Sequence, residues 1–325
     1  MPDLVMHHFF GRTILSSLDK EIVQKVDDLP LYDFATAGPD PFFFVKFLNS
    51  KINKESREFG NYMHVNKTRD FFVRLTNVAK KDTRMFNYLC GFIAHYALDV
   101  FCHPYIFYHT GVYKLEDKNT LEYRGLHTLL ERAIDIYIIK DQYCNYPYQF
   151  KIHKEVLTLK NLDESFKESF NEVYKVFDKN NGFDHVNSSI KYQKKFYKFI
   201  YDPHGVKNKI LTLLDNNKSN LDLKGLSYYK KGINEENLDI FNKNRDEWSN
   251  PIDETLSSND SFFDLVIKAK QFAIKMITNV YEYIFFDKEI NLDTVFTNLS
   301  YLTGLDCENK KPMYNFNNIF KKSLN

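Results

Sequence analysis

Residues 89–104, LCGFIAHYALDVFCHP, decide the fold and carry the most distinctive side chains of the chain. Nearly every position is apolar, so the pattern predicts a helix that is buried on all sides. His95 and Asp99 lie four positions apart, and at about 100° per residue they return to nearly the same face, one turn along. His103 follows one turn later, directly before Pro104, where we expect the helix to end.

The carboxylate of Asp99 needs a partner. Burying a bare carboxylate in an apolar helix costs several kcal/mol unless it is paired or bound to a cation. The sequence offers no Lys or Arg within a turn on either side. The imidazole of His95 and this carboxylate can converge on one cation, and a metal-free His–Asp hydrogen bond is the alternative.

Residues 124–137, RGLHTLLERAIDIY, repeat the spacing with His127 and Glu131. Arg124 and Arg132 are near, so a surface salt bridge is the alternative for Glu131. Two His-xxx-acid pairs on consecutive helices nevertheless predict a multi-metal site within the first 131 residues. Nitrogen and oxygen ligands in this mixture suit Zn²⁺ better than Mn²⁺ or Fe²⁺.

Helical periodicity dominates the rest of the chain, and strand patterns are rare, with no convincing hairpin signal. The sequence therefore predicts an all-α, single-domain multi-helix bundle over residues 1–325. Its metal ligands lie within residues 1–135, and helices in residues 136–325 complete the bundle. The expected helices cover residues 12–27, 67–80, 83–102, 121–141, 162–177, 190–200, 206–214 and 261–287.

Composition excludes some classes of protein. Lys and Arg number 44 against 43 Asp and Glu, a net charge of +1, which gives no support for a nucleic-acid binder that works by bulk electrostatics.

No stretch approaches 18 uncharged apolar residues, so we expect no membrane span. The start lacks a secretory signal and the four cysteines form no CxxC pair, so we expect reduced thiols and a cytoplasmic location. Cys102, beside His103, is a further candidate ligand.

Three other segments carry weaker signals. Asp40 stands in a Gly/Pro turn, GPDPFFF at residues 38–44, where an Asp is usually a capping residue. His64, in GNYMHVNKT at residues 60–68, precedes a helix expected from about Lys67 and can be an ordinary loop histidine. His7 and His8 lie in MHHFFG near the start of the chain, and surface positions are the alternative for both.

Together these segments resemble the zinc-dependent phospholipase C family, whose superfamily also holds zinc-dependent single-strand nucleases. The shared elements occur in the same order over about the first 135 residues: a His ahead of Phe-Gly, a GPD turn, GN-x-x-H, a helix with His-xxx-Asp, a following His, and His-xxx-Glu on the next helix. The resemblance implies an all-α fold with the metals in a cleft between helices.

The resemblance also implies three metal positions. Asp40, His64, His95 and Asp99 would hold one ion, His103, His127 and Glu131 a second, and His7 together with a bridging Asp99 the third. The chain departs from the family in lacking an N-terminal Trp at the third position, so two or three zinc ions are expected and His7 and His8 both remain candidates. His103 also follows His95 more closely than in the family.

The activity implied is hydrolysis of a phosphodiester, in which metal-activated water attacks a phospholipid headgroup phosphate and Asp40 orients or deprotonates that water. His-xxx-Glu resembles the phospholipases, whereas the nucleases tend to carry Asp there. We therefore expect a phospholipid or another phosphodiester as substrate, with peripheral membrane contact and without nucleic acid. The alternatives are a zinc-dependent single-strand nuclease or nucleotidase, and a non-catalytic metal-binding helical protein.

Overall fold

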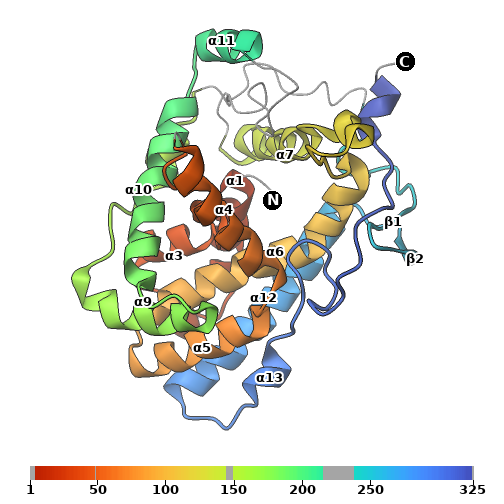
Figure 1. The fold of residues 1–325 in the computed structure, drawn as a ribbon. Helices are drawn as coiled ribbons and strands as arrows, with labels where there is room; N and C mark the ends of the chain where they lie inside the picture. Colours follow the sequence, from red (N-terminus) through yellow and green to blue (C-terminus); the bar gives the residue numbers. More distant parts are fainter. Residues whose placement is uncertain (1–3, 48, 144–148, 215–237, 324–325) are drawn as a thin grey trace.

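The computed structural model describes residues 4–47, 49–143, 149–214 and 238–323, which form a predominantly α-helical structure (Figure 1). This confirms the predicted fold class. One hydrophobic cluster runs from Leu4 to Phe320, so segments from both ends of the sequence share a core. The limits of the domain, residues 1–325, stay a prediction.

The α-helices are α1 Leu4–Leu15, α2 Lys20–Val23, α3 Leu29–Ala35, α4 Ser50–Val65, α5 Thr68–Lys81, α6 Met85–Thr110, α7 Leu126–Gln142, α8 Ile152–Glu155, α9 Lys167–Tyr174, α10 Gly182–Ile200, α11 Val206–Leu214, α12 Phe262–Phe285 and α13 Leu292–Val295. The 3-10 helices are η1 Asp40–Phe44, η2 Lys118–Tyr123, η3 Glu164–Phe166, η4 Lys175–Phe177 and η5 Ile319–Ser323. The strands are β1 Trp248–Asn250 and β2 Asp253–Ser258.

Helix α6 runs through the centre of the bundle and packs against α1, α3, α5, α7 and α12 (Figure 1). This follows from its apolar sequence, because a helix without a polar face must be covered on every side. Among the described residues α6 is also the one helix long and apolar enough to cross a bilayer, but 94% of that window is buried inside the protein. Such burial is typical of the core helix of a folded bundle, which passes the same test of length and composition.

The expectation that this helix ends before Pro104 is wrong, because α6 continues to Thr110. A proline inside a helix costs about 3 kcal/mol through one lost hydrogen bond and a steric clash. Burial outweighs that cost here, since Tyr105 and Ile106 are both 0% exposed. As a consequence, His103 lies on the same continuous helix as the two ligand candidates that precede it.

The structure also corrects the N-terminal helices. The helix predicted over residues 12–27 is replaced by α1, which begins at Leu4, and by the short α2. Val5, Phe10 and Ile14 of α1 are buried, whereas Ser16, directly after the helix, is exposed. Helix α4 was not expected, and it places His64 in its last turn instead of in a loop.

In the C-terminal part the structure confirms one predicted helix and adds elements that were not predicted, among them a hairpin. Helix α12 was predicted from its apolar stripe and begins with a capping box, in which Ser261 Oγ accepts the N–H of Asp264 at 3.2 Å and Asp264 accepts the N–H of Ser261 at 2.8 Å. The antiparallel hairpin of β1 and β2 was missed. It is a short sheet whose turn contains Pro251, and its strands show no clear alternation.

Candidate metal centre

Helix α6 supplies three of the candidate ligands from one face. The Nε2 of His95 lies 3.0 Å from Oδ2 of Asp99, and the Nδ1 of His103 lies 3.7 Å from the same oxygen. All three side chains are 0% exposed. The four-residue spacing therefore brings the side chains together as the sequence predicted.

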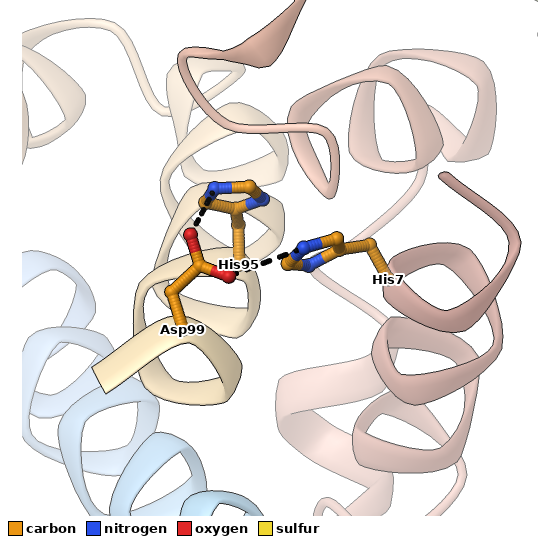
Figure 2. Close-up of side chains that lie close together, drawn as sticks. All are labelled: His7, His95 and Asp99. Atoms are coloured by element: carbon orange, nitrogen blue, oxygen red, sulfur yellow. Dashed lines mark ion pairs between the residues drawn. The ribbon is translucent and has the colours of Figure 1, made fainter. Parts of the chain in front are cut away.

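Helix α1 adds His7, whose Nε2 lies 3.3 Å from Oδ1 of Asp99 (Figure 2). Its ring stacks on that of His95 with 4.0 Å between centroids. Burial lowers the pKa of His7 to about 4. The imidazole is therefore neutral at physiological pH, which is the form that binds metal.

His8 lies beside Asp33, away from the candidate ligands on α6. Its Nδ1 lies 3.5 Å from Oδ1 of Asp33, and the other oxygen of Asp33 accepts a hydrogen bond of 2.5 Å from Arg12. Burial and, second, the charge of Arg12 lower the pKa of His8 to about 4. Of the two neighbouring histidines, only His7 reaches the side chains on α6.

A second group forms where η1 and α4 meet α6. Oδ1 of Asp40 lies 3.3 Å from Nε2 of His64 and 3.9 Å from Nε2 of His95. Asp40 begins η1 directly after a turn in which Gly38 has φ +52°, and a Cβ on Gly38 would lie 2.2 Å from the ring of His95. The glycine thus allows this turn, and with it Asp40, to approach the histidine closely.

A third group lies between α6 and the first turns of α7. Nε2 of His127 is 2.8 Å from Oε1 of Glu131, and Nε2 of His103 is 3.7 Å from the same oxygen. Burial lowers the pKa of His103 and that of His127 well below the usual value. His127 is the most accessible member, with 26% of its side chain exposed, whereas Cys102 belongs to none of the three groups.

Backbone carbonyls fix the orientation of three imidazoles. The Nδ1 atoms of His64, His95 and His103 lie 2.7, 3.1 and 2.7 Å from the carbonyl oxygens of Gly60, Thr36 and Tyr301. A carbonyl can only accept, so each Nδ1 carries the proton and each Nε2 presents a lone pair to the cluster. This arrangement is typical of histidines that ligate a metal. The same arrangement assigns His103 to the group of Glu131. The Nδ1 of His103, which is the ring nitrogen nearer Asp99, already donates to the carbonyl of Tyr301, and its Nε2 faces Glu131.

Five buried atoms of the cluster, on four of the candidate ligands, have no hydrogen-bond partner within the described part of the chain. Among the described residues no hydrogen-bond partner is found for the Nε2 atoms of His64, His95 and His103 or for either carboxylate oxygen of Asp99. No Lys or Arg of the described residues forms an ion pair with Asp99 either. A carboxylate that is fully buried without a Lys or Arg partner is costly, and a bound cation removes that cost.

The separations of the ligand atoms fit zinc. Two atoms that each lie about 2.1 Å from one tetrahedral zinc are about 3.4 Å apart, and the shortest separations in the first two groups are 3.0 Å for His95–Asp99 and 3.3 Å for His64–Asp40. The three groups that could each hold one ion are His7, His95 and Asp99; Asp40, His64 and His95; and His103, His127 and Glu131. All eight side chains singled out in the sequence are therefore in place, with His95 shared by two groups.

One positioning residue was missed in the sequence. The carboxylate of Asp135 accepts the backbone N–H groups of Val5 at 3.0 Å and Met6 at 2.8 Å, which are free donors at the start of α1, immediately before His7. Asp135 follows Glu131 by four residues on an apolar helix and is 1% exposed. The argument applied to Asp99, that a carboxylate on a buried face needs a partner, could have found it.

Replacing Asp135 with alanine is expected to loosen the start of α1 and, through it, His7. Loss of this capping carboxylate weakens binding of the ion at His7 by about 10–100-fold, while the other two groups keep their ligands. Zinc titration monitored by competition with a chromophoric chelator measures this, with Asp141→Ala, an exposed carboxylate on the same helix, as control. Unchanged affinity at every position in Asp135→Ala would show that the carboxylate is not needed to position His7.

A family comparison completes this description. The family described as zinc-dependent phospholipase C matches residues 6–180, more than half of the 325-residue chain, and all eight clustered side chains lie within this range. The match extends beyond the first 135 residues on which the resemblance was based. Comparisons with curated proteins and with solved structures gave no significant match. The chain therefore belongs to the zinc-dependent phospholipase C family.

Proposed function

We propose that this protein hydrolyses phospholipids at the headgroup phosphate and uses two or three zinc ions to do so. The observation that carries the proposal is the set of three ligand groups along one face of α6, whose ligand atoms lie within 4.8 Å of one another in each group. Family membership supports the same class of activity. The substrate, the reaction and the number of ions are the parts that are proposed.

The ligands divide among the ions as the groups do. Asp40, His64 and His95 would hold one ion, and His103, His127 and Glu131 a second. His7 and Asp99 would hold the third, with Asp99 facing His95 through its other oxygen. Three protein ligands at each of the first two ions is the number typical of catalytic zinc sites, which keep a position open for water or substrate, and the third ion would have two.

Bound zinc would supply two effects, a lowered pKa for a bound water and charge stabilisation for the phosphoryl oxygens. Asp40 is the proposed proton acceptor, because its carboxylate borders two of the histidines and its side chain is 10% exposed. In the reaction the water oxygen would bond to phosphorus, the water proton would pass to Asp40, and the bond from phosphorus to the glycerol oxygen would break. The proton held by Asp40 would then pass to the glycerol oxygen, which leaves as an alcohol and restores the carboxylate. The products are a phosphorylated headgroup and a diacylglycerol.

Two observations favour a lipid over a nucleic acid. Phe43 is half-buried beside the centre, where its ring stacks on His64 with 5.6 Å between centroids, so an apolar wall adjoins the ligands. The net charge of +1 offers no general attraction to a polyanion. Glu131 at the second position also follows the phospholipase pattern of the resemblance.

The test is release of phosphocholine from phosphatidylcholine in mixed micelles by the purified protein. We expect release that a chelator abolishes and added zinc restores. His7→Gln and His8→Gln form a matched pair, because they change adjacent buried histidines of which only the first faces the ligands. The first variant is expected to lose activity and the second, if folded, to keep it.

Parallel assays separate this proposal from its competitors. Chelator-sensitive digestion of single-stranded DNA or RNA without hydrolysis of any phospholipid would replace the lipase proposal by a nuclease. Bound zinc without turnover of either substrate would identify a metal-binding protein that is not an enzyme.

A further inference from the structure

The end of α10 and the adjoining α11 expose an unusual group of apolar side chains. Phe199, Val206, Ile210 and Leu213 are 45, 57, 51 and 85% exposed. The last three occupy positions i, i+4 and i+7 of α11 and therefore form a stripe along one face of the helix. Single exposed apolar residues are ordinary, but a contiguous group on one short segment indicates a surface that meets another apolar phase.

Lysines flank this stripe. Lys191, Lys195 and Lys198 on α10 and Lys209 on α11 are exposed, and none of them forms an ion pair with a described residue. The one acid between residues 185 and 214, Asp202, is 4% exposed and accepts the N–H of Val206 at 3.0 Å. The surface is therefore strongly cationic in a chain whose net charge is only +1.

Two more lysines tie the segment to its surroundings. Lys207 Nζ donates to the carbonyl oxygens of Phe199 at 2.6 Å and Tyr201 at 2.9 Å, and Lys194 Nζ donates to that of Leu157 at 2.7 Å. Figure 1 shows α11 at the far end of α10, at the edge of the molecule. The exposed apolar side chains of α11 thus lie at the edge of the molecule, and Lys207 ties the start of α11 to the end of α10.

An aromatic chain joins this surface to the metal centre. The ring of Phe199 lies 5.9 Å from that of Phe47, which lies 5.4 Å from Phe196, and Phe196 lies 4.5 Å from Phe44. Phe44 is the last residue of η1, and Asp40 is its first. Phe199, at the end of α10, and Asp40 therefore belong to two directly packed segments, α10 and η1.

We propose that this surface, defined by the exposed side chains of Phe199, Val206, Ile210 and Leu213 and the four exposed lysines beside them, docks the protein onto a bilayer that contains anionic lipid. Apolar residues on one face with lysines beside them are the pattern by which helices lie in the bilayer interface, and lysines near the surface are attracted by anionic headgroups. The proposal rests on the phospholipase function, because a long-chain phospholipid in a membrane presents its headgroup at such a surface.

The experiment is co-sedimentation of the full chain with vesicles of phosphatidylcholine alone and of phosphatidylcholine with phosphatidylserine. We expect tighter binding to the anionic vesicles, weakened by salt. Replacing Lys191, Lys195 and Lys198 with glutamine is expected to reduce this binding by about 100-fold. Ile210→Ser with Leu213→Ser is expected to reduce binding by more than about tenfold.

Matched controls lie on another face. Ile267 and Phe286 are 55 and 63% exposed, and their replacement by serine, like Lys275→Gln on α12, is expected to leave vesicle binding unchanged. Equal losses in these controls, or unchanged binding in the α10–α11 variants, would overturn the proposal. Self-association of the native chain that the serine variants abolish would do so too, by identifying a second copy as the occupant of the stripe.

A soluble substrate separates this proposal from the proposed function. Hydrolysis of a short-chain phosphatidylcholine dispersed as monomers needs the metal centre but no bilayer. Docking variants that keep this activity and lose hydrolysis of vesicles support both proposals. Anionic vesicle binding that depends on the stripe, without hydrolysis of any substrate, would support docking and refute the phospholipase function.

Discussion

Asp99→Asn is expected to lose the zinc ion at His7 and to reduce hydrolysis by more than about 100-fold, while its metal-free form is at least as stable as metal-free native protein. The carboxylate contacts His7 through one oxygen and His95 through the other. An amide has no negative charge and only one oxygen, so it cannot present an oxygen to His7 and to His95 at once. Its NH2 can, however, donate to the Nε2 of His95, whose Nδ1 proton is already donated to the Thr36 carbonyl.

The substitution is expected to lower zinc binding but not the stability of the metal-free protein, so the two measurements test the assignment in opposite directions. Metal-free native protein must bury an uncompensated carboxylate, and zinc stabilises it by binding only to the folded state. Thermal unfolding of both proteins with zinc and with chelator, together with zinc analysis after dialysis, measures the two effects. Full zinc content in Asp99→Asn would contradict the assignment.

Asp33→Asn is the matched control for that variant. Asp33 is also buried, at 4% exposure, but it pairs with Arg12 and His8 away from the ligand groups. The Asp33→Asn variant is expected to lower the free energy of unfolding, because Arg12 loses its charged partner, and to retain its zinc. A shared loss of zinc in both variants would point to general disruption of the fold.

Gly38→Ala is expected to destabilise the protein more than any other single methyl addition near the site. A Cβ at Gly38 would lie 2.2 to 2.7 Å from three ring atoms of His95, and φ is +52°. The backbone conformation costs about 1–3 kcal/mol for a residue other than glycine, and the overpacking adds about 1–3 kcal/mol. Because the ring of His95 is fully buried, it has no space into which it can move.

A double-mutant cycle separates these two costs. In a His95→Ala background the clash disappears and only the backbone strain remains, so Gly38→Ala should cost about 1–3 kcal/mol less there. Chemical denaturation of the four proteins gives the coupling energy. Equal costs in the two backgrounds would mean that the turn at Gly38 does not press against His95, and the account of how Asp40 reaches the centre would be wrong.

The residues on α6 and α7 were predictable because the reasoning needed only helix geometry. His95 with Asp99 and His127 with Glu131 each lie one turn apart, and the cost of burying a carboxylate predicts a partner for Asp99 without any knowledge of the fold. His7, Asp40 and His64 were expected mainly from the resemblance, because nothing local in a turn or at the start of the chain shows what lies opposite in space.

The errors have physical causes as well. Local rules end a helix at Pro104, but tertiary burial of Tyr105 and Ile106 outweighs the local penalty. Choosing between His7 and His8 required the orientation of α1, which Asp135 fixes from 128 positions further along the chain than His7. Such contacts between distant segments leave no periodic signal in either segment.

The carbonyl of Tyr301 accepts the Nδ1 proton of His103, and the N–H of Tyr301 donates to the carbonyl of His64 at 2.9 Å. Synthesis proceeds from the N-terminus at about 5–20 residues per second. All eight ligands therefore leave the ribosome many seconds before Tyr301 does, and a nascent chain carries the full ligand set while two of its histidines still lack their final supports. Completion of the candidate centre thus waits for the segment that contains Tyr301, and zinc loaded earlier would meet an unfinished site.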